Sequence, residues 1–419
     1  MTARRVAVTG LGVVSPAGLD ARSMFGRLLD GESFVRLHTI DQPPRPITQP
    51  AIHCADFNGD TAIGRPLASS TDRSVQMALA ACFEAWKDAG LERSPANGAG
   101  NPDHGVSWGS ALGSTTTWER GYKEMWQNGR DRLPPLSVVL GMSNAAASHI
   151  SIQLGLGNAS LTYVAACASA AAAIGEGYKR IRNGEATLMV TGGSDVPLAY
   201  AVMKAWDALR VVALGDEDSA PGCCRPFHPG RSGLVLGEGA ATLILEEWEH
   251  ARARGATILA ELVGYGTCSD HTHLVRPDRD GQVRAMRLAL DDAGLTPDEV
   301  DYVNAHGTAT IEGDAIEVDS LRTLFGARAA EVPVSATKSM HGHLMGAAGA
   351  IEALTTVLAL HQDALPPTAN LDTIDPACAG VRHIVGGALR NSGARVALSN
   401  SFAFGGCNAV LAFRKAEAH

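Results

Sequence analysis

Cys167 stands where an apolar, strand-like segment runs into very small side chains, in residues 163–175 (YVAACASAAAAIG). The change of pattern predicts a strand end, a turn at the cysteine and a helix after it. Backbone N–H groups at a helix start stabilise anions, so this position predicts a lowered pKa for the thiol and a reactive thiolate. An inert cysteine in an alanine-rich core helix explains the same residues. The segment alone leaves both interpretations open.

His306 lies between a short apolar stretch and a turn of small residues, which suits a rigidly presented imidazole. Thr308 and Thr310 alternate along the following turn, so their hydroxyls are candidates for binding one ligand. A buried structural histidine is the alternative, and for a single histidine it is the more common outcome.

A lysine and two histidines precede a second run of small residues, in residues 335–349 (SATKSMHGHLMGAAG). Lys338 and His343 are candidate site residues there, because the arrangement mirrors the segment around Cys167. A solvated Lys/His cluster is the alternative. It is disfavoured by residues 344–350, whose small and apolar side chains predict burial.

The last segment with candidate site residues is 399–409 (SNSFAFGGCNA), where two phenylalanines precede a glycine pair. Phe402 and Phe404 suggest a hydrophobic gate whose backbone N–H groups can approach a ligand. A strand–turn–strand corner filled by aromatic rings is the alternative. Cys407, in the same segment, is predicted to be a core residue.

The elements that would position these residues alternate between helical and strand patterns, which predicts an α/β fold. Two Asp-Ala-Gly-Leu helix ends begin at Asp88 and Asp292, 204 residues apart by number, and similar elements follow each. We therefore predict a duplicated chain, with one half over residues 1–252 and the other over 253–419. The boundary is expected in a charged helix over residues 246–254. Residues 10–12 (GLG) do not complete a dinucleotide-binding fingerprint, because the third glycine is missing.

The composition describes a globular protein of 419 residues, with 45% hydrophobic and 19% charged residues. A net charge of −9 gives no electrostatic support for a nucleic-acid partner. The amino terminus does not resemble a signal peptide, and the longest apolar run is too short to span a membrane. Eight scattered cysteines without a Cys-x-x-Cys pair argue against a zinc site or a disulfide framework. These features predict a cytoplasmic protein without a bound metal.

The four segments, in this order, resemble the β-ketoacyl synthase family of the thiolase-like fold, especially its elongating type II members. Residues 6–12 (VAVTGLG), 225–227 (RPF) and 237–240 (GEGA) agree with the family as well. The resemblance extends over nearly the whole chain. It implies a duplicated fold with α-β-α-β-α layers and a decarboxylative Claisen condensation of fatty-acid type.

The resemblance also implies a role for each candidate residue. Cys167 would carry the acyl group, and His306 and His343 would assist the loss of carbon dioxide and stabilise the enolate. Lys338 would help to fix His343, with Glu352 as its counter-charge. The remaining roles fall to six residues. Thr308 and Thr310 would bind the pantetheine arm, Phe404 would form the oxyanion hole and part of the gate, Phe402 would complete the gate, and Leu112 and Trp206 would line the acyl tunnel.

The implied partners are acyl carrier protein and its acyl and malonyl thioesters. No cofactor of the enzyme's own is implied, since the carrier supplies the phosphopantetheine arm. Arg210 falls where the family has a docking arginine. The family's usual basic cluster before Asp72 is replaced by residues 68–71 (ASST), which leaves Arg65 and Arg73 nearby. The family also implies a homodimer, with a heterodimer with a related subunit as the alternative.

Some residues differ from the family's usual ones and point to a specialised branch. These are Ala165, Ala170, Ile311, Gly313, His341, Ala403 and Cys407. Residues 144–147 (NAAA) place small side chains where bulkier ones are common, which favours a ketosynthase of a type II polyketide or polyene pathway as the second hypothesis. A non-catalytic chain-length partner subunit is disfavoured because the cysteine and both histidines are present. A thiolase is disfavoured because its second cysteine motif is not recognisable.

Overall fold

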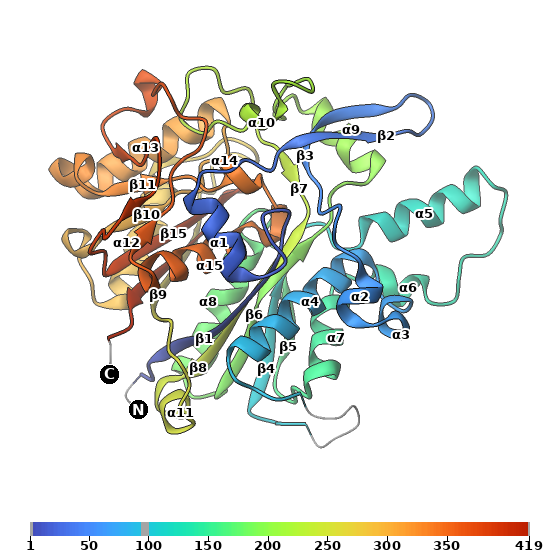
Figure 1. Cartoon of the computed structure of the whole chain (residues 1–419), viewed down its shortest axis with the longest axis horizontal. Coiled ribbons are helices and arrows are strands. Elements are labelled where there is room, and N and C mark those ends of the chain that lie inside the picture. Colours follow the sequence, from blue (N-terminus) through green and yellow to red (C-terminus); the bar gives the residue numbers. More distant parts are fainter. Residues whose placement is uncertain (1–2, 94–99, 418–419) are drawn as a thin grey trace.

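The computed structural model describes residues 3–93 and 100–417, so part of the polar loop expected after Leu91 lies outside the described residues. Its main feature is a mixed sheet of 11 strands in the order β13-β11-β10-β15-β16-β9-β1-β8-β6-β4-β5 (Figure 1). In chain order these are β1 (Val6–Val14), β4 (His104–Gly109), β5 (Ser160–Tyr163), β6 (Leu188–Asp195), β8 (Gly239–Glu247), β9 (Ala260–Ser269), β10 (Tyr302–Asn304), β11 (Pro333–Ser335), β13 (Arg382–His383), β15 (Val396–Ala403) and β16 (Cys407–Lys415).

The strand order mirrors itself about the contact between β1 and β9. In one half β4 is parallel to β5 and β6, and β8 runs antiparallel between β6 and β1. In the other half β10 is parallel to β11 and β15, and β16 runs antiparallel between β15 and β9. The halves join through three residue pairs between Val6–Val8 and Ala260–Leu262. The mirrored order confirms the predicted duplication of the fold.

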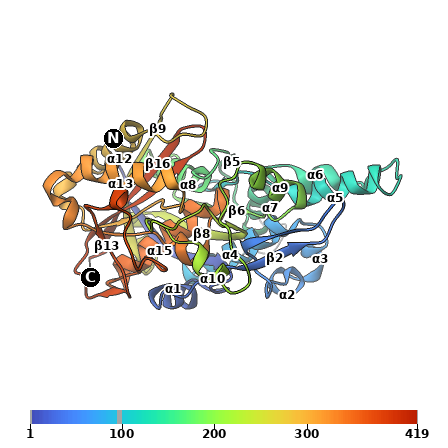
Figure 2. The ribbon, with the colours of Figure 1, turned by 90° about the horizontal axis from the view of Figure 1, so that it is seen from above.

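Helices form three layers around the two halves of the sheet. The central layer consists of α8 (Ser169–Arg182) and α15 (Ala348–His361), which contact each other and the inner sheet faces (Figures 1 and 2). The outer layers are α4 (Arg73–Asp88) with α7 (Ala145–Leu154), and α12 (Arg279–Ala293) with α13 (Ile311–Phe325). This arrangement confirms the expected α-β-α-β-α layering.

The duplication extends to the packing of a helix on each first strand. A Cβ atom at Gly12 of β1 would lie 2.0 Å from the Ala81 carbonyl oxygen of α4, and one at Gly266 of β9 would lie 2.1 Å from the Ala285 carbonyl oxygen of α12. Only glycine allows such close approach. Ala81 and Ala285 are 204 residues apart, the offset expected from the sequence. The glycines of residues 10–12 thus lie within a strand that contacts a helix.

The small residues expected before and within the central helices allow these helices to approach closely. A Cβ atom at Gly349 of α15 would lie 2.8 Å from the backbone nitrogen of Ala171 in α8. Every residue of α15 from Ala348 to Leu360 is buried. As a result, the starts of both central helices lie inside the molecule, where Cys167 and His343 precede them.

Shorter elements complete the chain. These are α1 (Ala21–Leu29), β2 (Arg36–Ile40), β3 (Ile47–Ile52), α2 (Gly59–Ile63), α3 (Arg65–Ala68), α5 (Thr115–Trp126), α6 (Ser137–Gly141), α9 (Tyr200–Ala208), α10 (Ala220–Cys223), β7 (Leu236–Gly237), α11 (Trp248–Ala253), α14 (Lys338–His341), β12 (Ala364–Leu365), β14 (Leu389–Arg390) and four 3₁₀ turns (Pro297–Glu299, Gly326–Ala330, Met345–Ala347 and Pro376–Cys378). The charged helix expected over residues 246–254 is shorter, because Glu246 belongs to β8. Among the described residues, none of the helices has the length and apolar character needed to cross a bilayer.

Candidate active site

The chain makes a strained turn immediately before Cys167. Ala166 has φ +47°, a left-handed conformation that costs an alanine roughly 1–2 kcal/mol. The Ser169 hydroxyl holds the turn, since it accepts the Ala165 N–H at 2.9 Å and donates to the Ala166 carbonyl at 2.6 Å. Because α8 begins at Ser169, the turn presents the cysteine at the start of a central helix.

The expectation of a lowered pKa for Cys167 is wrong in this structure. Burial is the largest effect and raises the pKa of the thiol to about 12. The charge of Lys338 and hydrogen bonds from the backbone N–H groups of Phe404 and of Cys167 itself lower the pKa, but by less than burial raises it. The thiol is therefore protonated at neutral pH, and an acceptor must take its proton as the sulfur reacts.

The two histidines approach the sulfur from the other half of the chain. His306 follows β10, and Glu317 of α13 holds its backbone by accepting the N–H groups of His306 and Gly307, both at 2.8 Å. His343 follows α14, and its N–H donates to the Val235 carbonyl at 2.7 Å. Both imidazoles are thus fixed by backbone contacts to neighbouring elements.

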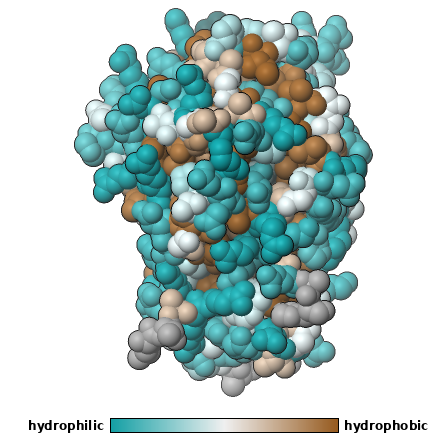
Figure 3. Space-filling model, turned by 90° about the vertical axis from the view of Figure 1, so that its left-hand side faces the viewer, coloured by the Kyte–Doolittle hydropathy of each residue, from teal (hydrophilic) through white to brown (hydrophobic). Residues whose placement is uncertain are grey.

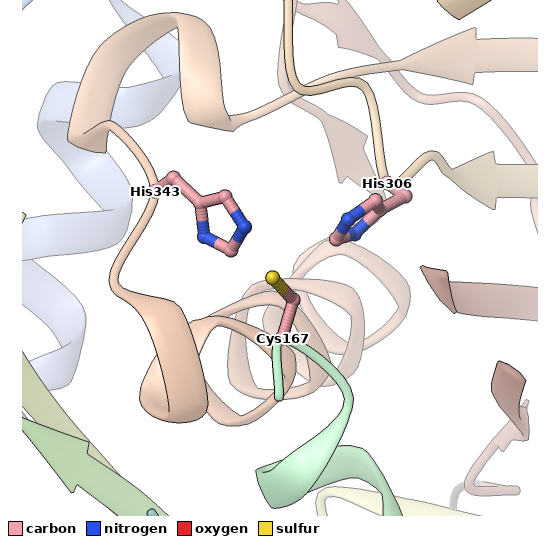
Figure 4. Close-up of side chains that lie close together, drawn as sticks. All are labelled: Cys167, His306 and His343. Atoms are coloured by element: carbon pink, nitrogen blue, oxygen red, sulfur yellow. The ribbon is translucent and has the colours of Figure 1, made fainter. Parts of the chain in front are cut away.

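Cys167, His306 and His343 meet at one point, as Figure 4 shows. One ligand-type atom from each residue lies within 4.8 Å of those of the other two. The two imidazole rings are nearly perpendicular, at 88°, with centroids 5.5 Å apart. The structure therefore brings together the three residues that the sequence singled out.

The hydrogen bonds of each imidazole determine which nitrogen carries the proton. The Lys338 ammonium, which can only donate, lies 3.2 Å from Nδ1 of His306. The Met345 N–H donates to Nδ1 of His343 at 3.2 Å. Both Nδ1 atoms are thus acceptors, and in the neutral rings the proton is on Nε2. Nε2 of His343 is buried and has no hydrogen-bond partner within the described chain, so it is free to donate to a substrate oxygen.

This placement of the protons on Nε2 opposes metal binding, although the three side chains are close enough to surround an ion. An imidazole that binds a metal usually donates its other N–H to an acceptor. Here the other nitrogen of His306 and of His343 receives a donor. The site is therefore arranged to offer N–H groups and not lone pairs.

Lys338 contacts His306 and not His343, which corrects the role expected for it. Its ammonium donates to the His306 carbonyl at 2.7 Å and pairs with the Glu352 carboxylate, with both side chains buried. Burial raises the pKa of Glu352 to about 7, against the lowering effect of the Lys338 charge. Glu352 is thus the counter-charge, as expected.

Burial keeps both imidazoles neutral. It lowers the pKa of His306 and of His343 well below the usual value, and the nearby charge of Lys338 lowers both further. A neutral imidazole with its proton on Nε2 is a good donor to a developing oxyanion in a site without bulk water.

A cavity of about 370 Å³ connects the three residues to solvent. Its lining includes Thr308 and Thr310, whose hydroxyl oxygens are 3.0 Å apart, and both gate candidates, Phe402 and Phe404. Trp206 and the exposed Arg210 also line it. The cavity thus joins the proposed pantetheine, gate and docking residues to the reactive cysteine.

Other candidates do not reach this cavity. Leu112 is 36% exposed and is not part of the lining. Ala145–Ala147 pack into a separate core with Trp108, so they do not enlarge the space around the sulfur. Arg73 forms two hydrogen bonds with the buried Glu238 carboxylate, at 2.9 and 2.7 Å, which commits it to the fold. Cys407 is only partly buried, so the expectation of a core residue is wrong.

Sequence reasoning missed residues that hold the site without touching substrate. The buried carboxylate of Asp195 accepts hydrogen bonds from the Ala111 and Leu112 N–H groups at 2.8 and 3.2 Å and from Gly346 N–H at 2.6 Å, so it links the two halves. Glu317 and Ser169 similarly fix the turns before and after reactive residues. An acidic residue at the end of a strand, directly after small residues, as Asp195 ends β6, is the signal that could have revealed one of them.

Comparisons with known proteins agree with this geometry. Two family models match the chain, "Beta-ketoacyl synthase, N-terminal domain" over residues 3–251 and "Beta-ketoacyl synthase, C-terminal domain" over residues 259–372. The chain is 39% identical to 3-oxoacyl-[acyl-carrier-protein] synthase 2 of Staphylococcus aureus (strain N315) over 422 residues, covering 99% of each protein.

Solved structures give the same result. A β-ketoacyl synthase from Burkholderia phymatum STM815 has a TM-score of 0.89 at 36% identity, covering 99% of this chain and 100% of that one. The ishigamide ketosynthase/chain length factor has a TM-score of 0.90 at 32% identity, with the same coverage. Together with the cysteine and two histidines at the bottom of the cavity, these matches show that the chain belongs to the β-ketoacyl synthase family.

Proposed function

We propose that this acyltransferase extends an acyl chain by decarboxylative condensation with a malonyl thioester, both delivered on acyl carrier protein. One observation carries the proposal: the Cys167 sulfur lies between two neutral imidazoles that present N–H donors, at the end of a cavity open to solvent. This is the arrangement that acyl transfer to sulfur and stabilisation of an enolate both require.

In the first step, Sγ of Cys167 attacks the acyl thioester on the carrier. A new C–S bond forms at Cys167, the pantetheine C–S bond breaks, and the thiol proton passes to the leaving pantetheine sulfur. The N–H groups of Cys167 and Phe404 stabilise the tetrahedral oxyanion, since both already point at the sulfur. Because the proton moves within the exchange, the raised pKa of the thiol does not prevent the step.

In the second step, the malonyl thioester occupies the cavity, with its pantetheine arm beside Thr308 and Thr310. Its terminal C–C bond breaks, carbon dioxide leaves, and the electron pair becomes an enolate whose oxygen accepts hydrogen bonds from Nε2–H of His306 and His343. The enolate carbon then attacks the Cys167 thioester. The C–S bond breaks, the 3-oxoacyl product leaves on the carrier, and the sulfur takes a proton from solvent.

Lys338 acts on this step as a positioning residue. Its ammonium holds Nδ1 and the carbonyl of His306, so it fixes both the tautomer and the backbone. Phe402 lies edge-on to His306, with ring centroids 6.2 Å apart, and shields the enolate from water. No cofactor of the enzyme's own takes part, since the carrier brings the pantetheine thiol.

The proposed carrier docks at the cavity mouth, where Arg210 is exposed and can attract an acidic protein. We also propose a homodimer through β5 and the helices beside it. This side carries apolar residues at the surface, among them Val138 (68% exposed) and Val164 (64% exposed). By contrast, hydrophilic residues cover most of the face formed by the carboxy-terminal half, the left side of Figure 1 (Figure 3). Leu112, exposed in the single chain, would border the acyl tunnel at such an interface.

We further propose two structural halves, residues 1–252 and 253–419, and a cytoplasmic location. The division falls within α11, between the last strand of one half and the first strand of the other. The eight cysteines, all within the described chain, are free thiols, which suits a reducing compartment.

A type II polyketide ketosynthase is the second candidate, because a ketosynthase bound to a hexaketide, solved with its type II PKS acyl-carrier protein, is a structural neighbour with a TM-score of 0.87 at 28% identity. The small residues 145–147 no longer favour it, since they pack away from the cavity. Loading the enzyme from carriers that bear saturated or polyketide acyl groups separates the two. Faster loading of Cys167 by polyketide intermediates would favour the second candidate.

The main test is intact-mass analysis of the enzyme after incubation with acyl carrier proteins. We expect an acyl adduct on Cys167, and a 3-oxoacyl carrier product once malonyl carrier protein is added. Cys167→Ala should retain the fold and show neither reaction. A Cys167→Ala enzyme that still gains acyl mass and condenses would contradict the mechanism.

A further inference from the structure

The ring of Phe404 lies on the ring of Trp206 where the cavity reaches the sulfur. The two ring centroids are 5.9 Å apart and the ring planes differ by 21°, which is a stacked pair. Both residues line the cavity together with Cys167. The stacked pair therefore forms part of the cavity wall next to the reactive atom.

Trp206 belongs to a firmly held helix. The N–H groups of Tyr200 and Ala201, at the start of α9, donate to the Glu119 carboxylate at 3.0 and 2.7 Å. Glu119 belongs to α5, which packs beside α9 (Figure 2). The Tyr200 hydroxyl donates to the Arg45 carbonyl at 2.7 Å, and Met203 is fully buried. These contacts hold in place the helix that carries the Trp206 indole.

Phe404 begins the turn between two strands. β15 ends at Ala403 and β16 begins at Cys407, and the two glycines between Phe404 and Cys407 have φ +85° and +71°. Backbone hydrogen bonds hold this turn to a neighbouring loop: the Gly405 N–H donates to the Leu274 carbonyl at 2.7 Å, and the Gly406 carbonyl accepts the Asp270 N–H at 2.9 Å. The Phe404 ring itself stacks on Trp206, so this contact bears on the position of the ring.

An acyl chain on Cys167 needs space beside the Phe404 ring. The open cavity must admit the second thioester and its pantetheine arm. The first chain then has to extend among the apolar side chains that pack around Cys167 without lining the cavity, including Leu198, Met203 and Met345. Phe404, whose N–H reaches the sulfur, stands beside that path.

We propose that Trp206 is a specificity-determining residue that holds the Phe404 ring closed, so that long acyl chains load only when the stack opens. The inference rests on the proposed function, because it concerns acyl transfer to Cys167. A stacked aromatic pair contributes about 0.5–1.5 kcal/mol, which corresponds to roughly a 2- to 12-fold change in the ratio of closed to open positions of the Phe404 ring. Short acyl groups, which fit beside the sulfur, do not require this opening.

The test compares the rates at which acetyl- and palmitoyl-pantetheine thioesters acylate Cys167, followed by intact mass. The acyl carbon leaves the pantetheine sulfur for Sγ, and the thiol proton goes to the released pantetheine. In Trp206→Ala the palmitoyl-to-acetyl rate ratio should rise by roughly 2- to 12-fold over the parent. Trp206→Phe keeps an aromatic face and should keep the parent ratio. Leu209→Ala, on the same helix end, 54% exposed and outside the cavity lining, is the matched control and should also keep it.

Trp206→Leu retains apolar bulk without a ring face. If the alanine variant fails to fold, the palmitoyl-to-acetyl rate ratio of the leucine variant tests the inference in its place. An unchanged or lower ratio in the folded alanine or leucine variant would overturn the inference, as would an equal rise in Leu209→Ala. If the parent enzyme is not acylated on Cys167 at all, the proposed function fails instead. The two failures are therefore distinguishable.

Discussion

The ionisation of Cys167 gives the sharpest test of this site, because sequence and structure predict opposite shifts of its pKa. A helix start predicts a thiolate at neutral pH, whereas burial in the structure raises the pKa to about 12. With that value, about 1 in 100,000 of the Cys167 thiols is ionised near pH 7, and the fraction grows tenfold with each pH unit. The rate of alkylation should therefore increase about 100-fold between pH 7 and pH 9.

The assay is the rate of iodoacetamide alkylation of the free enzyme, followed at the Cys167 peptide by mass spectrometry. Cys268 and Cys407, which are partly buried, are followed in the same digest as internal references for labelling. Cys167→Ser confirms the assignment of the labelled peptide. A rate at Cys167 that is already constant between about pH 7 and pH 9 would refute the reasoning, because it would require a pKa below about 7.

Three further predictions concern the two imidazoles at the sulfur, the buried Lys338–Glu352 pair and His341. His306→Ala and His343→Ala should retain acyl loading but lose condensation by about 100-fold or more, because each removes an N–H donor to the enolate. Condensation is measured as the 3-oxoacyl product. An equal loss of loading and condensation would contradict the assigned roles. Lys338→Met should lower the free energy of unfolding by about 3–5 kcal/mol in denaturant titrations, since it leaves Glu352 buried without its partner. Adding Glu352→Gln should recover part of that loss, and no recovery would exclude the ion pair as the cause. Burial lowers the pKa of His341 to about 3. Below about pH 6.5 the unfolded chain therefore binds a proton at this imidazole that the folded chain does not bind. The stability of the folded protein that depends on neutral His341 is thus lost as the pH falls. Relative to the parent, His341→Thr should therefore gain about 1.4 kcal/mol of unfolding free energy per pH unit between about pH 6 and pH 4, and a constant difference would contradict the shift.

The fold was accessible from the sequence because local patterns recur in it. The helix ends at Asp88 and Asp292 and the small residues before the central helices record the duplication directly. The hydrogen bonds from Leu11 N–H to Asp88, at 3.0 Å, and from Tyr265 N–H to Asp292, at 3.1 Å, show that both copies use the aspartate in the same way. What the pattern did not show is that one ladder continues from β1 to β9, because strand pairing across the halves leaves no local signal.

The candidate site, like the fold, could be predicted only in part from the sequence. Residue type and flanking pattern made Cys167, His306, His343 and Lys338 candidates, and the resemblance of the four segments to one family selected them together. They were not sufficient to pair Lys338 with His306, because that contact depends on how α14 lies against the turn after β10. The prediction that Ala145–Ala147 line the pocket was wrong for the same reason, because tertiary packing decides which way a helix face points.

The sequence by itself determined the α/β class through short-range periodicity, and the family, with the identity of the reactive groups, through the resemblance of four short segments and their order. Only the tertiary structure decided the states of those groups. The protonation of Cys167, the tautomers of the two imidazoles and the partner of Lys338 depend on burial and on donors contributed by distant segments. Desolvation and hydrogen bonding act through space, so no inspection of neighbouring residues along the chain could supply them.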